Sequence, residues 1–203
     1  MSDSHNILSS SAEPTSPALT SEERILIATN IEYNQTGSLP LSLGTIAERA
    51  HLSRSLIYAH FPDQYALINA LLEVHISALQ PHVVLLLQEN DNFQNASAAL
   101  ADLLLTHYLD AGLLPADAPQ DDFCRGHLSP KARKFYRQII LSLTHKAMAE
   151  FGLAKRQARA TVLMLSALPE QGARLASTEQ ASAEITRTTQ KRIIRLTVET
   201  LRS

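Results

Sequence analysis

Residues 45–61, TIAERAHLSRSLIYAHF, constrain the fold of this chain more than any other stretch. Two short apolar patterns with helical spacing are separated here by the turn HLS. A short turn between two crossed helices is typical of a helix-turn-helix. One turn residue then tends to need a positive φ angle, and histidine, present here as His51, is enriched in that region among non-glycine residues. The residues predicted to bury between the two helices are Ile46, Ala47, Ala50, Leu52, Ile57 and Phe61.

Helical signals extend along nearly the whole chain. Thr20 and Glu23 form a capping-box pattern, which predicts a first helix ending at Gly37, and Pro40 marks the following connector as non-helical. We find no strand-like alternation and no internal repeat. The sequence therefore predicts an all-α fold of about nine helices. After the first, the main expected segments are residues 42–50, 53–61 and 63 to a break or kink at Pro81, with Ser42, Ser53 and Asp63 as their N-caps. The later segments are residues 92–111, 129–151, 154–176, and Ser177 or Thr178 to the C-terminus.

Length and composition suit a folded chain. With 203 residues and 45% hydrophobic content, it can form one medium domain or a small domain joined to a larger one. Residues 1–19 differ, because they are rich in serine and contain no lysine or arginine, and we expect a disordered tail there. Cys124 is the only cysteine, which excludes an intrachain disulfide and a zinc site built on cysteine pairs.

No membrane association is expected. The longest apolar runs, residues 83–87 and 161–168, are well short of the roughly 20 residues that span a bilayer. The N-terminus lacks the basic and apolar regions of a secretion signal. Together with the single cysteine, these features predict a cytoplasmic protein.

Charge is unevenly distributed along the chain. Residues 1–124 contain three Lys/Arg and 15 Asp/Glu, a net charge of −12, whereas residues 125–203 contain 15 and five, a net charge of +10. A basic surface is the usual sign of a nucleic-acid-binding domain, and here the helix-turn-helix pattern lies in the acidic half. We therefore expect weak non-specific affinity for DNA.

The second helix of the pair has a polar N-terminal end. Arg54 follows Ser53 and shares a helix face with Tyr58 one turn later. An arginine at this place in a recognition helix can donate to guanine O6 and N7, while hydroxyl groups and helix N-termini hold phosphates. Spacing alone leaves a second interpretation open, in which the two helices form a structural hairpin, with Arg54 solvated and Tyr58 and His60 half-buried.

The flanking residues resemble the N-terminal DNA-binding domain of the TetR (tetracycline-repressor) family of bacterial transcription regulators. The resemblance runs from Glu23 to Leu72 and rests on Arg24, Ile25, Leu26, Ala28, Tyr33 and Gly37, followed by IAERA, LS, IYAHFPD and ALINALL. It implies a helix-turn-helix DNA-binding domain over residues 20–72 and a helical ligand-binding and dimerisation domain over residues 73–203. The implied partners are a double-stranded DNA operator, a small-molecule effector and a second copy of the chain, with repression as the expected activity.

Carried over residue by residue, the resemblance assigns candidate DNA contacts and shows departures. The candidates are Arg54 and Ser55 for base edges, Tyr58 and His60 for the backbone or a thymine, Ser42 and Ser53 for phosphates, and the departing positions Gly44 and Gln64. Gln64 replaces a lysine that holds a phosphate in many members, and Gly44 stands where a longer side chain often reaches DNA. Glu32 occupies a position that is usually apolar in the family.

The last two predicted helices carry apolar stripes. Paired antiparallel with a second copy, they would form a four-helix bundle with twofold symmetry, placing two recognition helices about 34 Å apart on a near-palindromic site. The alternative is that the stripes serve only the core of one chain. The stripe residues are Val162, Leu165, Leu168 and Leu175 in one helix, and Ile185, Ile193, Leu196 and Leu201 in the other.

An effector pocket is expected near Pro169, which must kink the helix predicted over residues 154–176 and free the carbonyl of Leu165. A mostly apolar set of residues with a few polar groups suits a small-molecule site, although each residue alone is more often an ordinary core residue. No chemical class of effector follows from the sequence. The candidate lining residues are His107, Tyr108, Phe123, Cys124, His145, Met148 and Met164.

The segment KARKFYR places Lys131, Lys134 and Arg137 at helical spacing near a helix start. We interpret it as a solvated face, or else as a surface that docks against the acidic N-terminal half or accepts an anionic partner.

We expect no enzymatic activity, no cofactor and no bound metal. The chain has no Gly-rich phosphate loop, no GxSxG motif and no histidine pair at i, i+4. Cys124 with His127 is a conceivable thiolate pair but lacks an orienting third group. The stronger rival to a DNA-binding regulator is a helical dimerisation or interaction protein that does not bind DNA.

Overall fold

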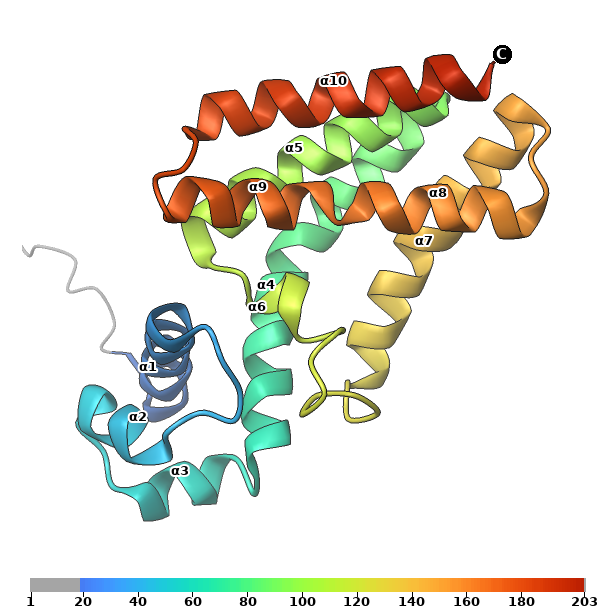
Figure 1. The fold of residues 1–203 in the computed structure, drawn as a ribbon. Helices are drawn as coiled ribbons and strands as arrows, with labels where there is room; N and C mark the ends of the chain where they lie inside the picture. Colours follow the sequence, from blue (N-terminus) through green and yellow to red (C-terminus); the bar gives the residue numbers. More distant parts are fainter. Residues whose placement is uncertain (1–18, 203) are drawn as a thin grey trace, which may run out of the picture.

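A computed structural model describes residues 19–202, and every regular element within them is a helix (Figure 1). The predicted all-α class is confirmed, whereas the predicted tail, residues 1–19, lies outside the described residues apart from Leu19. The helices are α1 (Ser21–Thr36), α2 (Leu43–Ala50), α3 (Arg54–His60), α4 (Gln64–Glu89), α5 (Phe93–Ala111), α6 (Leu114–Asp117), α7 (Pro130–Phe151), α8 (Lys155–Ser166), α9 (Leu168–Ser177) and α10 (Ala183–Leu201).

The starts of the first four helices follow from their capping residues. Thr20 and Glu23 form the predicted capping box of α1, with Thr20 Oγ1 accepting from the Glu23 N–H at 3.2 Å. The predicted N-caps of α2, α3 and α4 also accept from the backbone in this way, which satisfies N–H groups that the helix itself leaves unpaired. These caps are Ser42, Ser53 and Asp63.

Helix α4 links the three N-terminal helices to the rest of the molecule (Figure 1). Of the break or kink predicted at Pro81, the break is wrong, because the helix continues to Glu89. Pro81 removes one hydrogen bond, while buried Leu79 and Val83 on either side hold the helix in the core. Among residues 19–202, α4 is the one helix long and apolar enough to cross a bilayer, a test that core helices also pass; α4 packs against α1, α5 and α7.

The C-terminal helices differ from the prediction at two points. The segment predicted as one helix is split into α8 and α9 at Ala167, and Pro169 stands at the start of α9, where its missing N–H is not needed. The last helix begins at Ala183, capped by Ser182, rather than at Ser177 or Thr178. Glu179 adopts a positive φ of 57° just after α9 and turns the chain before α10 can start.

The main core is continuous from the N-terminal helices into the C-terminal ones. Ile25, Ile46 and Ile57 of α1, α2 and α3 are buried in the same cluster as Leu72 of α4 and Phe93 of α5. The upper part of Figure 1 shows α10 and the α8–α9 pair lying across α5. The recognition-helix candidate α3 is thus at one end of the molecule, and the α8–α10 group is at the other.

Candidate nucleic-acid interface and effector cavity

The turn between α2 and α3 has the conformation predicted for a helix-turn-helix. His51 is in the left-handed region with φ 51°, and its N–H donates to the carbonyls of Ala47 and Glu48. Arg24, on α1, donates through Nη2 to the carbonyls of Ala50 and His51, the latter at 3.2 Å. The first helix therefore holds the turn in place and fixes the angle at which α3 is presented.

Arg54 and Gly44 bring the N-terminal turns of α3 and α2 together. The Arg54 side chain is exposed, and its guanidinium lies so close to the Gly44 backbone that a Cβ atom there would overlap it. Gly44 therefore reaches no DNA by a side chain of its own. It provides the space in which Arg54 lies.

Arg54 is also the one uncommitted cation of residues 19–72, meaning the one Lys or Arg side chain there without a hydrogen bond or ion pair. Arg24 is engaged at the α2–α3 turn, and Arg49 pairs with Glu32 at 3.4 Å and also donates to Gln35. The ion pair explains why Glu32, only 5% exposed, is tolerated at a position that the family usually keeps apolar. Within residues 19–72 no hydrogen bond or ion pair is seen for the Arg54 guanidinium.

The other DNA-binding candidates fall into two groups. Ser55, Tyr58 and His60 are exposed on α3, with Tyr58 53% exposed. Ser42 and Ser53 are exposed caps, whose hydroxyl oxygens accept from the N–H groups of Thr45 and Leu56, and whose hydroxyl hydrogens remain for a phosphate. All five face solvent at this end of the molecule.

Gln64 has a different role from the predicted phosphate contact. Its Oε1 accepts from the Leu41 N–H at 2.9 Å, and its Nε2 donates to the Leu41 carbonyl at 3.1 Å. The two bonds attach the connector before α2 to the first residue of α4. We therefore remove Gln64 from the candidate phosphate contacts.

A cavity of about 380 Å³ lies in the C-terminal half, among α4, α5, α6, α7 and the α8–α9 junction. This volume is within the usual range for sites that bind small molecules. The break at Ala167 opens onto the cavity, which agrees with the expectation of a pocket beside the helix break. Its lining residues are Leu79, Leu104, Tyr108, Pro115, Ala116, Pro119, Gln120, Phe135, Tyr136, Ile139, Ile140, Leu163, Ser166, Ala167 and Glu170.

Of the predicted lining residues, only Tyr108 belongs to this cavity. His145 is exposed, Met164 is 77% exposed, and Met148 packs against the main core. These residues were chosen by residue type without the helix face, and their side chains do not line this cavity. Two pairs on α7 line the cavity at i, i+4 spacing, Phe135 with Ile139 and Tyr136 with Ile140. This spacing, which puts each pair on one helix face, is the sequence signal that could have identified them.

His107, Phe123 and Cys124 lie away from the large cavity. His107 Nε2 is 3.0 Å from Nδ1 of buried His75 on α4. Cys124 is buried, and burial, with a smaller effect of Asp121, raises the pKa of its thiol to about 11. A thiol with this pKa is protonated at neutral pH, so Cys124 is not an activated nucleophile.

The loop that carries Phe123 holds the start of α4. The Tyr65 ring stacks on Phe123 and on His127, with ring centroids 4.7 Å and 3.9 Å apart. Asn69 Nδ2 donates to the His127 carbonyl at 2.8 Å, and Asn69 Oδ1 accepts from the Ser129 N–H at 2.7 Å. These contacts attach the α6–α7 loop to the first turns of α4, directly after α3.

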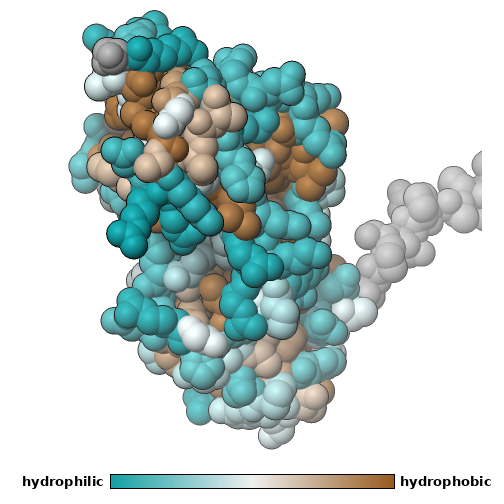
Figure 2. Space-filling model, turned by 90° about the vertical axis from the view of Figure 1, so that its right-hand side faces the viewer, coloured by the Kyte–Doolittle hydropathy of each residue, from teal (hydrophilic) through white to brown (hydrophobic). Residues whose placement is uncertain are grey.

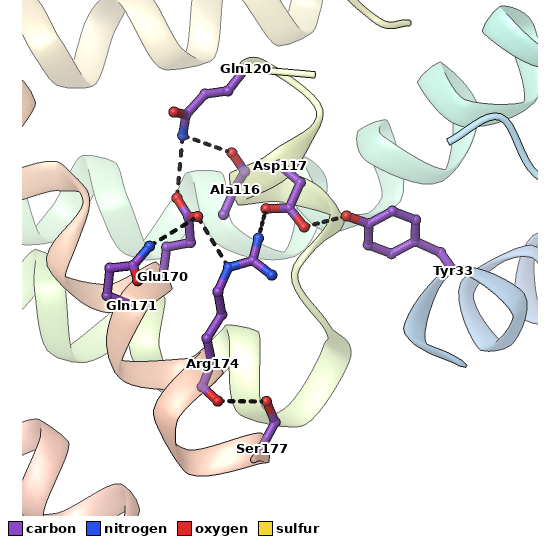
Figure 3. Close-up of polar contacts among 8 residues, drawn as sticks. All are labelled: Tyr33, Ala116, Asp117, Gln120, Glu170, Gln171, Arg174 and Ser177. Carbon is purple, nitrogen blue, oxygen red and sulfur yellow. Dashed lines mark hydrogen bonds and ion pairs between the residues drawn. The ribbon is translucent and has the colours of Figure 1, made fainter. Parts of the chain in front are cut away.

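A polar network connects the cavity to α1 (Figure 3). Glu170, on the cavity wall, accepts from Arg174 Nε at 3.3 Å and from Gln120 Nε2 at 3.2 Å. Arg174 Nη2 also donates to Asp117 Oδ1, and the Tyr33 hydroxyl of α1 donates to Asp117 Oδ2. Burial and the Asp117 carboxylate raise the pKa of Tyr33, so this hydroxyl remains a donor.

A second set of contacts joins α1 to the end of α5. Asn30 Nδ2 donates to the Ala111 carbonyl at 3.1 Å, and Asn34 packs tightly against Gly112. Between these contacts and the Asp117–Arg174 pair lies a second cavity of about 330 Å³. Helix α1 is thus attached to the helices around the cavity by these polar contacts as well as through α4.

The molecule thus combines an exposed helix-turn-helix with an all-helical part that contains a cavity. Residues 25–71 match the family model described as "Bacterial regulatory proteins, tetR family". The N-terminal helices of this chain are therefore similar to the part of that family which the model describes. A comparison with curated protein sequences finds no match.

Solved structures share the fold over most of their length. A TetR-like transcriptional regulator from Rhodococcus sp. RHA1 is 12% identical, with a TM-score of 0.67, covering 88% of this chain and 96% of that one. A TetR transcriptional regulator from Legionella pneumophila is 19% identical, with a TM-score of 0.65 and coverages of 90% and 99%. The regulator FadR from Bacillus subtilis, solved in complex with stearoyl-CoA, is 13% identical, with a TM-score of 0.65 and coverages of 84% and 96%.

Proposed function

We propose that this protein is a cytoplasmic repressor that binds a near-palindromic operator as a homodimer and releases it when a small molecule occupies the cavity of about 380 Å³. The observation that carries the proposal is the exposed outer face of α3, with Arg54 at its start and the turn before it fixed by Arg24. The DNA-binding domain covers residues 20–72, and residues 73–203 bind the effector and the second subunit.

Sequence readout falls to α3 in this proposal. Arg54 donates to the O6 and N7 atoms of a guanine, and Ser55 reaches a neighbouring base edge. Tyr58 and His60 contact the DNA backbone or a thymine methyl group. Ser42 and Ser53 donate their hydroxyl hydrogens to phosphates, assisted by the N-termini of α2 and α3.

Dimerisation uses the outer face of α9 and α10. Ile185 and Ile193, which the sequence placed in a stripe, are exposed, whereas neighbouring Ile194 and Val198 fill the core of the chain. A groove of about 160 Å³ between α9 and α10 is lined by Leu175, Ile185 and Ile193. Figure 2, which shows another side of the molecule, also has hydrophobic residues gathered over its upper half.

A polar group in the same groove supports this surface as an interface. Gln190 lines it and is 2% exposed, and its Oε1 and Nε2 have no hydrogen-bond partner among residues 19–202. Buried amides without a partner are costly, so a rearrangement of Gln190 that pairs it when a second subunit covers the groove is favoured. The fold also presents α10 as an outermost layer, open to a copy of itself (Figure 1).

Arg54→Ala tests the proposed DNA readout. Duplexes are first selected from a random library by the wild-type protein, and binding is then measured by gel mobility shift and footprinting. We expect the variant to lose about 1–3 kcal/mol of discrimination per half-site between selected and scrambled DNA, because the guanine contact is gone. Exposed Arg156→Ala on α8 is the control and should bind as the wild type does.

Two outcomes contradict the proposal. A footprint unchanged by Arg54→Ala excludes α3 as the reading element. Failure of the wild type to retard any duplex at low salt favours a helical interaction protein that does not bind DNA.

Sedimentation of Ile185→Glu tests the dimer, since a charge in the groove should yield monomers while the helical content stays the same.

A further inference from the structure

The large cavity has an unusual charge balance. Of its lining residues, Glu170 is the only one with a formal charge, and no lysine, arginine or histidine lies on the wall. The rest of the wall is apolar or neutral, with Gln120 and Ser166 as its amide and hydroxyl groups apart from the two tyrosines. An anion placed here meets a carboxylate and no cation.

The negative charge at Glu170 is only partly compensated. Its side chain is 14% exposed, as is that of Asp117, and the two carboxylates share one guanidinium, that of Arg174. Two nearly buried carboxylates with one cation leave a net negative charge in a poorly solvated place, which is unfavourable without a further positive group. The cavity is the open space next to that charge.

The aromatic wall suits the same kind of ligand. Tyr108, Phe135 and Tyr136 line the cavity, and the negative face of an aromatic ring attracts an organic cation. The Tyr136 hydroxyl donates to the Pro115 carbonyl at 2.8 Å. Burial raises the pKa of both tyrosines, so their hydroxyls stay neutral. Apolar and aromatic surface would cover the body of the ligand, and Glu170 would hold its charged group.

A cation at Glu170 also acts on the contacts of α1. Glu170 and Arg174 are one turn apart on α9, and Arg174 connects Glu170 to Asp117, which accepts from Tyr33. A ligand cation that pairs with Glu170 competes with Arg174 for the carboxylate. Tyr33 is buried in α1, the helix that holds the helix-turn-helix turn through Arg24. The network thus provides a physical path from ligand charge to DNA-reading geometry.

We propose that the effector is an organic cation, an ammonium group on an apolar or aromatic body, which pairs with Glu170 and weakens the Arg174–Asp117–Tyr33 connection to α1. The proposal rests on the proposed function, because it assigns a ligand class to the effector cavity. This ligand class differs from the stearoyl-CoA that is bound to FadR. The negative phosphates of such a ligand would meet the Glu170 carboxylate with no cation on the cavity wall to compensate.

The ligand class is tested with three matched probes, phenylbutyltrimethylammonium, phenylbutanol and phenylbutyrate, by calorimetry and thermal shift on the full chain. We expect the cation to bind about tenfold or more tightly than the alcohol, and the carboxylate most weakly. Glu170→Gln should remove the preference for the cation while leaving the alcohol unaffected. Exposed Glu184→Gln makes the same charge change outside the cavity and should retain the preference.

The coupling is tested on library-selected duplex DNA. The cation should weaken DNA binding by the wild type, and Asp117→Asn should still bind the cation but show a smaller loss of DNA affinity. Equal binding of the three probes, preference for the carboxylate, or no binding of the cation by a protein that still retards DNA each overturns the ligand class. If the wild type does not bind DNA even when no ligand is present, that result would instead count against the proposed function.

Discussion

The guanidinium of Arg54 lies directly against the backbone of Gly44, so the start of α3 and the start of α2 form one continuous surface. The position of the one uncommitted cation in residues 19–72 is therefore set by the absence of a side chain on the neighbouring helix. In the proposed complex with DNA, Gly44 is therefore a determinant of readout although it contributes no side-chain contact of its own.

Gly44→Ala should displace Arg54 without unfolding the domain. The new methyl group overlaps only the far end of a flexible side chain, and alanine favours a helix over glycine by about 1 kcal/mol. We expect an unchanged or slightly higher melting temperature and about a tenfold loss of affinity for selected duplexes. In the double variant with Arg54→Ala, the loss should not exceed that of Arg54→Ala alone; additive losses would show that Gly44 acts independently.

The salt dependence of DNA binding should be shallow. Each phosphate neutralised by a cation adds about 0.9 to the slope of log affinity against log salt, and little besides Arg54 and the helix N-termini is available here. Arg54→Gln should lower affinity while leaving this slope nearly unchanged, because a base contact releases no counterions. A slope that falls by about 1 per half-site would instead place Arg54 on a phosphate.

Arg49→Ala should destabilise the N-terminal helices. It leaves Glu32 buried without its cation, which we expect to cost about 1–3 kcal/mol, because Arg49 itself is partly solvated. The double variant Arg49→Leu, Glu32→Leu should recover most of the loss, since it replaces the pair by apolar side chains. Urea unfolding measures both, and equal stability of Arg49→Ala and the wild type would contradict the prediction.

Stability should decrease at acid pH through His75. Burial, with a smaller effect of His107, lowers the pKa of His75 from about 6.5 to about 4. Below about pH 6.5 the unfolded chain binds a proton that the folded chain does not, so the free energy of unfolding falls towards pH 4 by at most about 1.4 kcal/mol per unit. His75→Leu should reduce this slope in urea unfolding between pH 7 and pH 5, whereas exposed His145→Gln should not.

Local signals in the sequence were sufficient for the N-terminal helices. Thr20, Ser42, Ser53 and Asp63 cap helices where predicted, because a cap depends on a few neighbouring residues. His51 took the predicted left-handed conformation for the same reason. The resemblance to the TetR family, which the match over residues 25–71 supports for the N-terminal helices, then supplied the proposed function that spacing alone left open.

The cavity could not be predicted in this way, because its wall is assembled from five separate parts of the chain. Glu170 and Asp117 are distant in sequence, and nothing local indicates that they share Arg174. The roles of Gln64 and Gly44 were missed for a related reason, since each acts on a residue of another segment. Pro81 showed the limit of a local rule, because tertiary packing kept α4 continuous through it.

Having a single uncommitted cation on the reading surface affects how such a regulator is distributed in a cell. Non-specific affinity comes almost entirely from phosphate neutralisation, and a genome offers about a million or more random sites that compete for every copy. In the proposed function, Arg24 and Arg49 are bound internally and neutralise no phosphate, so few copies are held on random sequence. A small number of molecules then suffices to occupy the operator, and most of the remaining copies are free in solution to meet the effector.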